Sequence, residues 1–485
     1  MGQRAGTKLS EIVMGWQTIV KENNLDVSII PFDQLMERID AEYYRPRFLS
    51  GDRLIGNKQS TRLGDIADIK GGKRLPKGEV FSDNGIPYIR AEDVKNSFVE
   101  YENSPKISLE LQRKLKSYQT KLDDVLITIV GNSIGDVGIV KFELEKCNLT
   151  ENCAKLVNLK GINADYLFSF LLSKYGQNQI EREQVGTSQP KLALVRIRDF
   201  KLPVPNRDLQ EKISEIIRRA QQLKESSKQQ YVEAEKLLLK EINLEGYVPN
   251  EGNTSVRELT ECLADNRFDA EYWEPRFDEM EERVSTIPQQ ELGNIISIQK
   301  GIDPGSEAYT ESGKSFVRVS DISIYGIEDG DKKISDELYE ELKADYKPQK
   351  GEVLFTKDGT IGISFALHED IDAIVSSAFL RLKPKIKINI DYLTLVLNSL
   401  YCKFQIERMS GGAIIAHLKP ESVKKIKVPV LSDTKQEELA EKAVSSLRLR
   451  NEAKELLEKA KRAVEIFIEK DEQEALKYLA SGKAI

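Results

Sequence analysis

The sequence predicts an α+β fold in which two repeated mixed α/β domains are separated by two long antiparallel coiled-coil helices. Two observations predict this fold. The second half of the chain repeats the first, and each half closes on a stretch whose apolar residues recur at alternating spacings of four and three. The 485 residues are 40% hydrophobic, which is enough to bury a core in each half. The repeat implies a pseudo-two-fold relation between the halves, so the two helices are expected to pair antiparallel.

The repeat is clearest just before each mixed domain. RIDAEYYRPRF at 38–48 and RFDAEYWEPRF at 267–277 agree at eight of eleven positions, at an offset of 229 residues. The offset has fallen to 226 at the matching tripeptides 165–167 and 391–393, so only three residues are lost across half of the molecule. Neither chance nor shared composition produces such agreement. The protein is therefore two copies of one unit of about 226 residues.

Each mixed domain is expected to contain strands and one helical stretch. Short apolar runs at 125–130 and 353–355, punctuated by glycines, are typical of strands joined by turns. Apolar residues at helical spacing predict one helical stretch in each copy, at 164–183 and 390–408.

An extended strip that contains proline closes each mixed domain, at 201–205 and 427–430. Proline neither continues a helix nor donates to a strand ladder, so each strip marks a boundary. The predicted segments are a lead-in at 1–62, a mixed domain at 63–205, a long helix at 206–250, an acidic connector with the second lead-in at 251–291, a mixed domain at 292–429 and a second long helix at 430–485.

Each strip is followed by a helix of at least ~35 residues, roughly 50 Å at the standard rise per residue. Asp208 with Glu211, and Asp433 with Gln436, have the spacing of capping boxes. A 4-3 spacing held over about five heptads is typical of a coiled-coil seam, although each helix could instead pack on its own domain. The predicted seam residues are Leu209, Ile213, Ile216, Ala220, Leu223, Ala234 and Leu237 in the first helix and Leu439, Ala443, Ala453, Leu457, Ala460, Val464 and Phe467 in the second, with polar interruptions at Ser227, Gln230, Ser446 and Arg450.

The composition argues against several kinds of chemistry. Four cysteines form no C-x-x-C pair and only two histidines occur, so a Cys/His zinc site, a disulfide framework and imidazole catalysis are not expected. No G-x-G-x-x-G, no G-x-x-x-x-G-K-[ST] and no Asn-Pro-Pro-Tyr type of tetrapeptide occurs, so nucleotide hydrolysis and methyl transfer by this chain are unsupported. No run approaches ~18 apolar residues and the first thirty residues lack a signal-peptide core. We therefore expect a soluble, cytoplasmic protein with no membrane partner, no catalytic residues and no bound metal.

Polar and basic residues gather in loops at equivalent places in the two copies. Any one of these loops is more simply explained as an ordinary turn. The loops recur at equivalent places but with different residue types. This pattern favours two related domains that recognise different target sequences. The three pairs are KGGKRLPK at 70–77 with KGIDP at 300–304, GNSIG at 131–135 with KDGTIG at 357–362, and GTSQPK at 186–191 with GGAIIAH at 411–417.

These loops supply the residues that we predict to contact a polyanion. Glycines let the backbone approach a phosphate closely, and lysine and arginine supply positive charge. Arg90 and Asp93 recur as Arg318 and Asp321, and each pair is either a structural ion pair or a shared phosphate contact. The predicted nucleic-acid contacts are Lys70, Lys73, Arg74, Lys77, Arg90, Asn132, Ser133, Thr187, Ser188, Gln189 and Lys191 in the first copy and Lys300, Arg318, Lys357, Asp358, Thr360, His417 and Lys419 in the second.

The chain resembles the specificity (S) subunit of type I restriction–modification enzymes over almost its whole length. The resemblance is carried in the first copy by IPYIRAEDV at 86–94, DDVLITIVGNSIGDVGIV at 123–140, GTSQPKL at 186–192 and LPVPNRDLQEKI at 202–213. The second copy carries it in FVRVSDI at 316–322, GEVLFTKDGTIG at 351–362 and VPVLSDTKQEEL at 428–439. The second copy departs from the first at 411–416, where GGAIIA stands in place of the polar Thr-Ser-Gln.

The resemblance implies that each mixed domain is a target-recognition domain for one half of a bipartite, asymmetric site in double-stranded DNA. The helices would set the spacing, about 15 base pairs for roughly 50 Å, and would dock two methyltransferase subunits. S-adenosylmethionine, ATP and Mg would be bound by the methyltransferase and the restriction/translocase subunits, and this chain would be non-catalytic and bind no cofactor. Two alternatives are an orphan or regulatory DNA-binding protein of the same fold and a coiled-coil adaptor for protein partners alone.

The net charge of −7, taken over the whole chain, argues against a DNA partner. The charge is unevenly distributed along the chain, however. The connector at 251–291 holds four basic and twelve acidic residues, whereas the mixed domains at 63–205 and 292–429 have net charges of +2 and −1. The acidity thus belongs to the connector. We predict that the chain alone binds DNA weakly and that partner subunits supply much of the phosphate contact.

Overall fold

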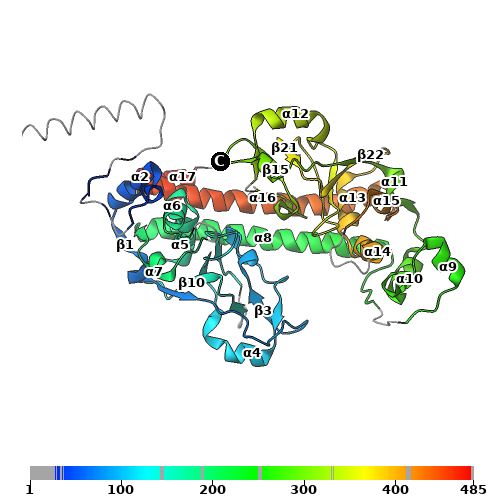
Figure 1. Cartoon of the computed structure of the whole chain (residues 1–485), viewed down its shortest axis with the longest axis horizontal. Helices are drawn as coiled ribbons and strands as arrows, with labels where there is room; N and C mark the ends of the chain where they lie inside the picture. The colour runs from blue at the N-terminus through cyan, green and yellow to red at the C-terminus, as the bar shows by residue number, and fades with distance from the viewer. Residues whose placement is uncertain are drawn as a thin grey trace, which may run out of the picture. The chain divides into compact units, whose positions relative to one another are not determined.

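The chain folds into two compact units in a computed structural model, drawn in Figure 1. The structure describes residues 28, 30–32, 35, 38–142, 147–186, 190–249, 254–328, 330, 332–410 and 417–481. The first unit consists of 1–222 with 452–485, and the second of 223–451. Two long helices, α8 (Arg207–Glu241) and α16 (Asp433–Glu469), each contribute one end to each unit.

Two small sheets form the mixed domain of the first unit. Strand β7 has the sequence Val-Leu-Ile-Thr and all four residues are buried, because β-branched and apolar side chains suit a strand covered on both faces. This confirms a strand in the run predicted at 125–130, although β7 ends at Thr128. Only the pairs β4–β8 and β3–β9 run parallel among the described strands of these sheets. The sheet orders are β2 (Asp68–Gly71), β10 (Cys153–Val157), β7 (Val125–Thr128), β8 (Val137–Ile139), β4 (Ser97–Phe98), and β5 (Lys106–Ile107), β3 (Ile86–Ile89), β9 (Cys147–Leu149), β6 (Gln119–Thr120).

The second unit repeats this arrangement. Its strand β19 is buried throughout, as β7 is, and lies between β22 and β20 in antiparallel register. The sheet orders are β13 (Ile296–Lys300), β22 (Phe379–Pro384), β19 (Val353–Thr356), β20 (Ser364–Ala366), then β14 (Tyr309–Thr310), β18 (Lys333–Ile334), β15 (Lys314–Val317), β21 (Ala373–Val375), and the pair β16 (Ile322–Ser323), β17 (Gly326–Ile327).

Each predicted helical stretch is two helices rather than one. The chain turns to an extended conformation at Ser173 and at Ser399, and the Ser173 hydroxyl accepts a hydrogen bond from the Gly176 amide at 3.3 Å. Serine at an N-cap starts a new helix because its oxygen satisfies an amide left free in the first turn. The stretches at 164–183 and 390–408 are thus α5 (Ala164–Leu172) with α6 (Lys174–Arg182), and α13 (Ile390–Asn398) with α14 (Leu400–Ser410).

Shorter helices complete both units. In the first unit they are η2 (Ala41–Tyr44), α2 (Pro46–Gly56), α3 (Leu63–Ile66), η3 (Ala91–Asp93), α4 (Leu109–Lys114), η4 (Lys116–Tyr118), α7 (Leu194–Arg198) and α17 (Glu472–Ala480). In the second unit they are α9 (Leu259–Asp265), η5 (Ala270–Trp273), α10 (Pro275–Val284), α11 (Leu292–Ile295), η6 (Ser306–Ala308), η7 (Val319–Asp321), α12 (Asp336–Tyr346) and α15 (Pro420–Lys424).

The proline strips form the second strand of a two-stranded ladder in each unit. β11 (Lys201–Pro203) pairs with β1 (Ser60–Arg62), and β23 (Lys427–Pro429) pairs with β12 (Gln289–Glu291). The buried hydroxyl of Tyr166 donates to the carbonyl of Pro203 at 2.6 Å, and Tyr392 makes the same bond to Pro429 at 2.8 Å. Each ladder therefore ties the residues just before a mixed domain to the residues that close it.

Within the second unit, α8 and α16 lie side by side and antiparallel. The Ser446 hydroxyl donates to the Ser227 carbonyl at 2.7 Å, and further along Lys435 pairs with Glu241 at 3.0 Å. Partner numbers rise along α8 and fall along α16, as an antiparallel pair requires. The two serines that interrupt the apolar seam thus supply each other's hydrogen-bond partners.

Details of the two helices differ from the predictions. Ile217 and Leu238 are fully buried, one residue beyond the predicted Ile216 and Leu237, which are half-buried. A straight helix of 3.6 residues per turn drifts away from a strict 3.5-residue seam, which moves the buried face by one position.

The caps also differ, since neither predicted aspartate is the N-cap of its helix: Asp208 lies inside α8, and Asp433 is the first residue of α16. Asn206 accepts from the Leu209 amide at 3.0 Å, and Ser432 accepts from the Lys435 amide at 3.4 Å. The predicted second helix also ends early, at Glu469, because Asp471 caps the separate helix α17. Among the described residues, no helix is long and apolar enough to cross a membrane, and no group of three or more His, Cys, Asp or Glu side chains could hold a metal ion.

One buried carboxyl makes the stability of the first unit depend on pH. Burial raises the pKa of Asp124 from its ordinary value of 3.8 to about 6. Between these values the folded chain keeps a proton that the unfolded chain has released, so the free energy of unfolding falls as the pH rises from about 4 to about 6, by on the order of 2 kcal/mol. Urea unfolding followed by circular dichroism should show that Asp124→Asn removes this contribution. Asp123→Asn, at the exposed neighbour, should keep it, and an unchanged slope in Asp124→Asn would contradict the assignment.

Candidate nucleic-acid interface

In the first unit the structure brings two predicted loops to one end of strand β7. Residues 131–135 join β7 to β8, and a β-bridge pairs Val130 with Lys191 from the loop that precedes α7. The Leu192 amide donates to the Ile129 carbonyl at 3.0 Å beside this bridge. The loop begins and ends on glycines with left-handed φ, 115° at Gly131 and 99° at Gly135, a conformation that side chains rarely adopt. Asn132 and Lys191 are exposed at this place, and Thr187, Ser188 and Gln189 lie outside the described residues.

The second unit brings the equivalent loops together at the end of β19. A β-bridge pairs Asp358 with His417, and the Leu418 amide donates to the Lys357 carbonyl at 2.9 Å. The two bridging side chains also bond, with Nδ1 of His417 donating to Oδ1 of Asp358. Since Nδ1 carries this hydrogen, Nε2 of the exposed ring is available to an outside partner.

Lys357 differs from the prediction because it is buried. Its ammonium group pairs with Oδ2 of Asp358, whose other oxygen bonds His417. A lysine held in this way neutralises the aspartate beneath the histidine rather than reaching outward. Thr360 and Lys419 are exposed in the neighbouring loop segments, and 411–416 lie outside the described residues.

A turn that the sequence did not single out joins these loops to the basic loop of the first unit. This turn, 150–152, connects β9 to β10. Its Asn152 carbonyl accepts from the Val130 amide at 3.3 Å, and its Glu151 carboxylate pairs with Arg74 at 2.5 Å. Next to the turn, the Lys73 amide donates to the Leu149 carbonyl at 2.8 Å. The turn therefore contacts the first loop and the residue that leads into the second, and the second is in turn bridged to the third at Lys191.

The same turn recurs at 376–378 in the second unit. The Lys357 amide donates to the Ala378 carbonyl at 2.8 Å, and Ile302 of the first loop bridges Ser376. We call these two surfaces the loop edges. The described residues of the first are 70–77, 131–135, 186 and 190–191 with the turn 150–152, and those of the second are 300–304, 357–362 and 417–419 with the turn 376–378.

The glycines of the basic loops serve the chain's own backbone. A Cβ atom on Gly72 would lie 2.0 Å from the Thr150 carbonyl oxygen, and one on Gly301 would lie 2.1 Å from that of Ser376. These glycines thus let the first loop approach the central turn, in place of the phosphate approach that the sequence suggested. Lys73 and Lys77 are exposed and form no ion pair with the described residues, whereas Lys70 pairs with Asp68 at 3.2 Å. Lys300 is also exposed.

The recurring arginine–aspartate positions have a structural role. Asp93 accepts from the Arg90 amide at 2.7 Å, and Asp321 accepts from the Arg318 amide at 2.8 Å, which caps the 3₁₀ turn that follows in each unit. The Arg318 side chain also lies 3.5 Å from Asp321, whereas that of Arg90 pairs with Glu92 instead. Of the two alternatives that the sequence left open, an intrachain ion pair is thus present in the second unit.

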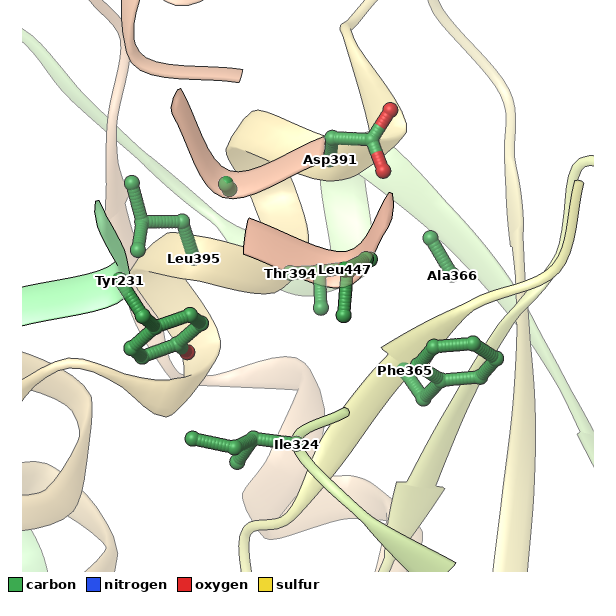
Figure 2. A pocket seen from close by; sticks show the side chains of 9 residues that line it. Tyr231, Ile324, Phe365, Ala366, Asp391, Thr394, Leu395 and Leu447 are labelled. Atoms are coloured by element: carbon green, nitrogen blue, oxygen red, sulfur yellow. The ribbon is translucent and has the colours of Figure 1, made fainter. Parts of the chain in front are cut away.

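A small hollow in the second unit lies apart from the loop edges. It is apolar, has a volume of about 10 Å³ and lies between α8, α13, α16 and β20, with room for one water molecule at most. Figure 2 shows Tyr231 of α8 and Phe365 of β20 on opposite sides of it. The loop edges, in contrast, are surfaces of exposed polar and basic groups, which suits contact with a long polar ligand.

Comparison with known proteins gives the chain a family context. The family model described as the type I restriction modification DNA specificity domain matches residues 56–236 and 285–458. The type I restriction enzyme MjaVIII specificity subunit of Methanocaldococcus jannaschii is 23% identical over 188 residues, which are 38% of this chain and 44% of that protein. The EcoBI specificity subunit of Escherichia coli is 29% identical over 141 residues, 29% of each chain. This chain thus matches less than half the length of either relative.

Solved structures of similar proteins cover more of the chain at lower identity. The S subunit of a type I restriction–modification system from M. genitalium is 15% identical, covers 87% of this chain and 95% of its own, and has a TM-score of 0.36. The HsdS subunit from Thermoanaerobacter tengcongensis is 16% identical over 85% and 96% of the two chains, with a TM-score of 0.27.

Proposed function

Because the chain belongs to the family of type I restriction–modification DNA specificity domains, we propose that it is the DNA sequence-recognition subunit of such a complex. Each loop edge would read one half of a bipartite, asymmetric site in double-stranded DNA. The observation that carries this proposal is that both units link three loops through an equivalent turn and an equivalent β-bridge, while the exposed side chains differ. Two half-sites of different sequence require this combination: the same backbone arrangement in both units, with different side chains available for contact.

The exposed groups of each loop edge match the donors and acceptors of base edges. In the first unit, Asn132 offers an amide that suits adenine, and Lys191 offers an ammonium that suits guanine. In the second unit, His417 and Thr360 offer a ring nitrogen and a hydroxyl, with Asp358 orienting the ring. We therefore assign base contacts to these side chains and phosphate contacts to Lys73 and Lys77.

The remaining parts of the proposal concern partners. Helices α8 and α16, of 35 and 37 residues, would set the distance between half-sites and dock two methyltransferase subunits. Restriction/translocase subunits would complete the complex in the cytoplasm. The partner subunits would bind S-adenosylmethionine, ATP and Mg. This chain would be non-catalytic and bind no cofactor.

Removing positive charge from the first loop edge tests the DNA contact. We expect Lys73→Ala with Lys77→Ala to weaken DNA binding by the full chain and to make the plot of log affinity against log salt concentration shallower by roughly 2, because about one counterion is released per phosphate contact. Fluorescence anisotropy with a labelled duplex measures both quantities.

The matched control is Lys95→Ala with Lys160→Ala, two exposed lysines of the same unit outside the loop edge. If both variants change the salt slope equally, the loop edge has no special part in binding. A chain that binds a specific duplex but recruits no methyltransferase would favour an orphan or regulatory protein, and a chain whose DNA affinity is unchanged in the loop-edge variant would favour a protein adaptor.

A further inference from the structure

A second exposed surface lies in each unit just before the mixed domain. We propose that Ile39 in the first unit, and Phe268 with helix α9 in the second, dock a partner protein that presents an apolar helix face bordered by lysine and arginine. The proposal goes beyond DNA reading because these residues lie outside the loop edges. We call the two surfaces the lead-in patches.

In the first unit, a clamp holds Ile39 outward. The flanking residues Arg38 and Asp40 form a bidentate pair with both hydrogen bonds at 2.8 Å. Arg38 also donates to the carbonyl of Arg182 at 2.9 Å, at the end of α6. With both neighbours bonded to the unit, the side chain between them projects away, and Ile39 is 82% exposed. An isoleucine fixed in this position gains nothing from the fold itself.

The second unit repeats the clamp around Phe268. Nε of Arg267 lies 2.7 Å from Oδ1 of Asp269, and the arginine donates to the carbonyl of Met409 at 3.3 Å, near the end of α14. Phe268 is 64% exposed. The clamp residues are the same in both copies, and the residue between them is isoleucine in one and phenylalanine in the other. Only the apolar character of the projecting side chain is shared, as expected of a contact residue rather than a packing residue.

Helix α9 enlarges the patch of the second unit. None of its seven residues is buried, and its two leucines, Leu259 and Leu263, are 65% and 60% exposed one turn apart on the same side. Isolated helices shorter than about 12–15 residues are marginal in water, so this helix gains stability when its apolar side is covered. Its polar side is already attached to the unit, since Asp265 accepts from the Tyr272 hydroxyl at 3.1 Å.

The charge around the lead-in patches selects the occupant. Exposed carboxylates at Glu258, Glu261, Asp265 and Glu271 lie among the apolar residues of the second patch in the chain, and Glu42 follows Ile39 in the first. With its four carboxylates, the second patch repels DNA, and it repels a second copy of itself because a symmetric contact would set acid against acid. A partner with an apolar helix face and a basic border complements it in both respects.

A model peptide tests the proposal with the full chain. The probe is a 20-residue fluorescent helix with leucine on one face and lysine on the other, and its counterpart carries glutamate in place of lysine. We expect saturable binding of the lysine peptide and binding of the glutamate peptide weaker by about tenfold or more. In the variant I39S/L259S/L263S/F268S, affinity for the lysine peptide should fall by about tenfold or more, because the apolar anchors are removed.

The matched control is L109S/L122S/I386S/V444S, which changes four exposed apolar residues outside the patches. This control should bind the lysine peptide as the unaltered chain does, and hydrogen exchange should show protection of α9 only when the peptide is bound. Equal loss in both variants, equal binding of the two peptides, or protection of α9 by DNA or by self-association would overturn the proposal. DNA affinity of the patch variant should be unchanged, so failure of DNA recognition and failure of docking give different results.

Discussion

Replacing Arg381 by methionine is expected to lower the free energy of unfolding of the second unit by about 3–5 kcal/mol, because it leaves a carboxylate buried without its partner. Arg381 and Glu352 are only 3% and 2% exposed, and they form two hydrogen bonds of 2.8 and 2.9 Å between β22 and the start of β19. The guanidinium also donates to the carbonyl of Asp345 at 2.7 Å. Urea unfolding followed by circular dichroism measures the change as a shift in the transition midpoint.

Two further variants separate the charge from the packing. The double variant R381M/E352L removes both charges and should recover most of the stability, since an apolar pair of similar size is often as stable as a buried ion pair. Lys387→Ala breaks an exposed pair with Asp433, 87% and 66% exposed, and should cost less than about 1 kcal/mol. A cost below about 1 kcal/mol for R381M itself would show that the buried pair contributes no more than a surface one.

Removing the exposed polar side chains of one loop edge is expected to weaken the base preference in one half of the DNA site. The base preference in the other half should stay unchanged. The variant N132A/K191A removes the exposed amide and ammonium groups of the first edge. Discrimination at the base pair that each of these side chains reads should fall by roughly 1–3 kcal/mol. Selection of bound duplexes from a random pool, with the full chain and its methyltransferase partners, measures the preference at every position.

The second edge supplies the matched control for the first. D358A/H417A should relax the opposite half-site by a similar factor, and neither variant should change the gap between the halves. If either variant relaxed both halves equally, or if no two-part motif were selected, the assignment of one half-site to each unit would be wrong. Because His417 and Asp358 bond each other, the single variant H417A should account for most of the effect of the pair.

The candidate site was predictable only in pieces. The recurring loops were visible because glycine, lysine and polar residues cluster locally, and the repeat aligns them. The turns at 150–152 and 376–378 carry no such signal, and their importance comes from hydrogen bonds to residues far away in the chain. For the same reason Lys357 was predicted as an exposed contact: the burial of its side chain against Asp358 depends on the bridge to His417, 59 residues later.

The lead-in motifs at 38–48 and 267–277 were also only partly interpretable from the sequence. Their eight identical positions revealed the repeat, yet the sequence alone did not distinguish the clamp residues Arg38 and Asp40 from the projecting Ile39. Apolar and charged residues alternate there, and only the partner carbonyl at the end of α6 decides which side chain turns inward. Whether an apolar residue is exposed depends on the segments that pack around it, so it is known only once the fold is known.

By itself, the sequence determined the duplication, the long helices and the membership of a DNA-specificity family, because periodicity, repeats and motifs are properties of neighbouring residues. Tertiary structure alone decided that Ile217 rather than Ile216 is fully buried, that Gly72 faces its own chain, and that a turn and a β-bridge link three loops in each unit. These outcomes depend on strand register and on packing between distant segments. Such packing forms only when the whole core assembles, so no local pattern specifies it.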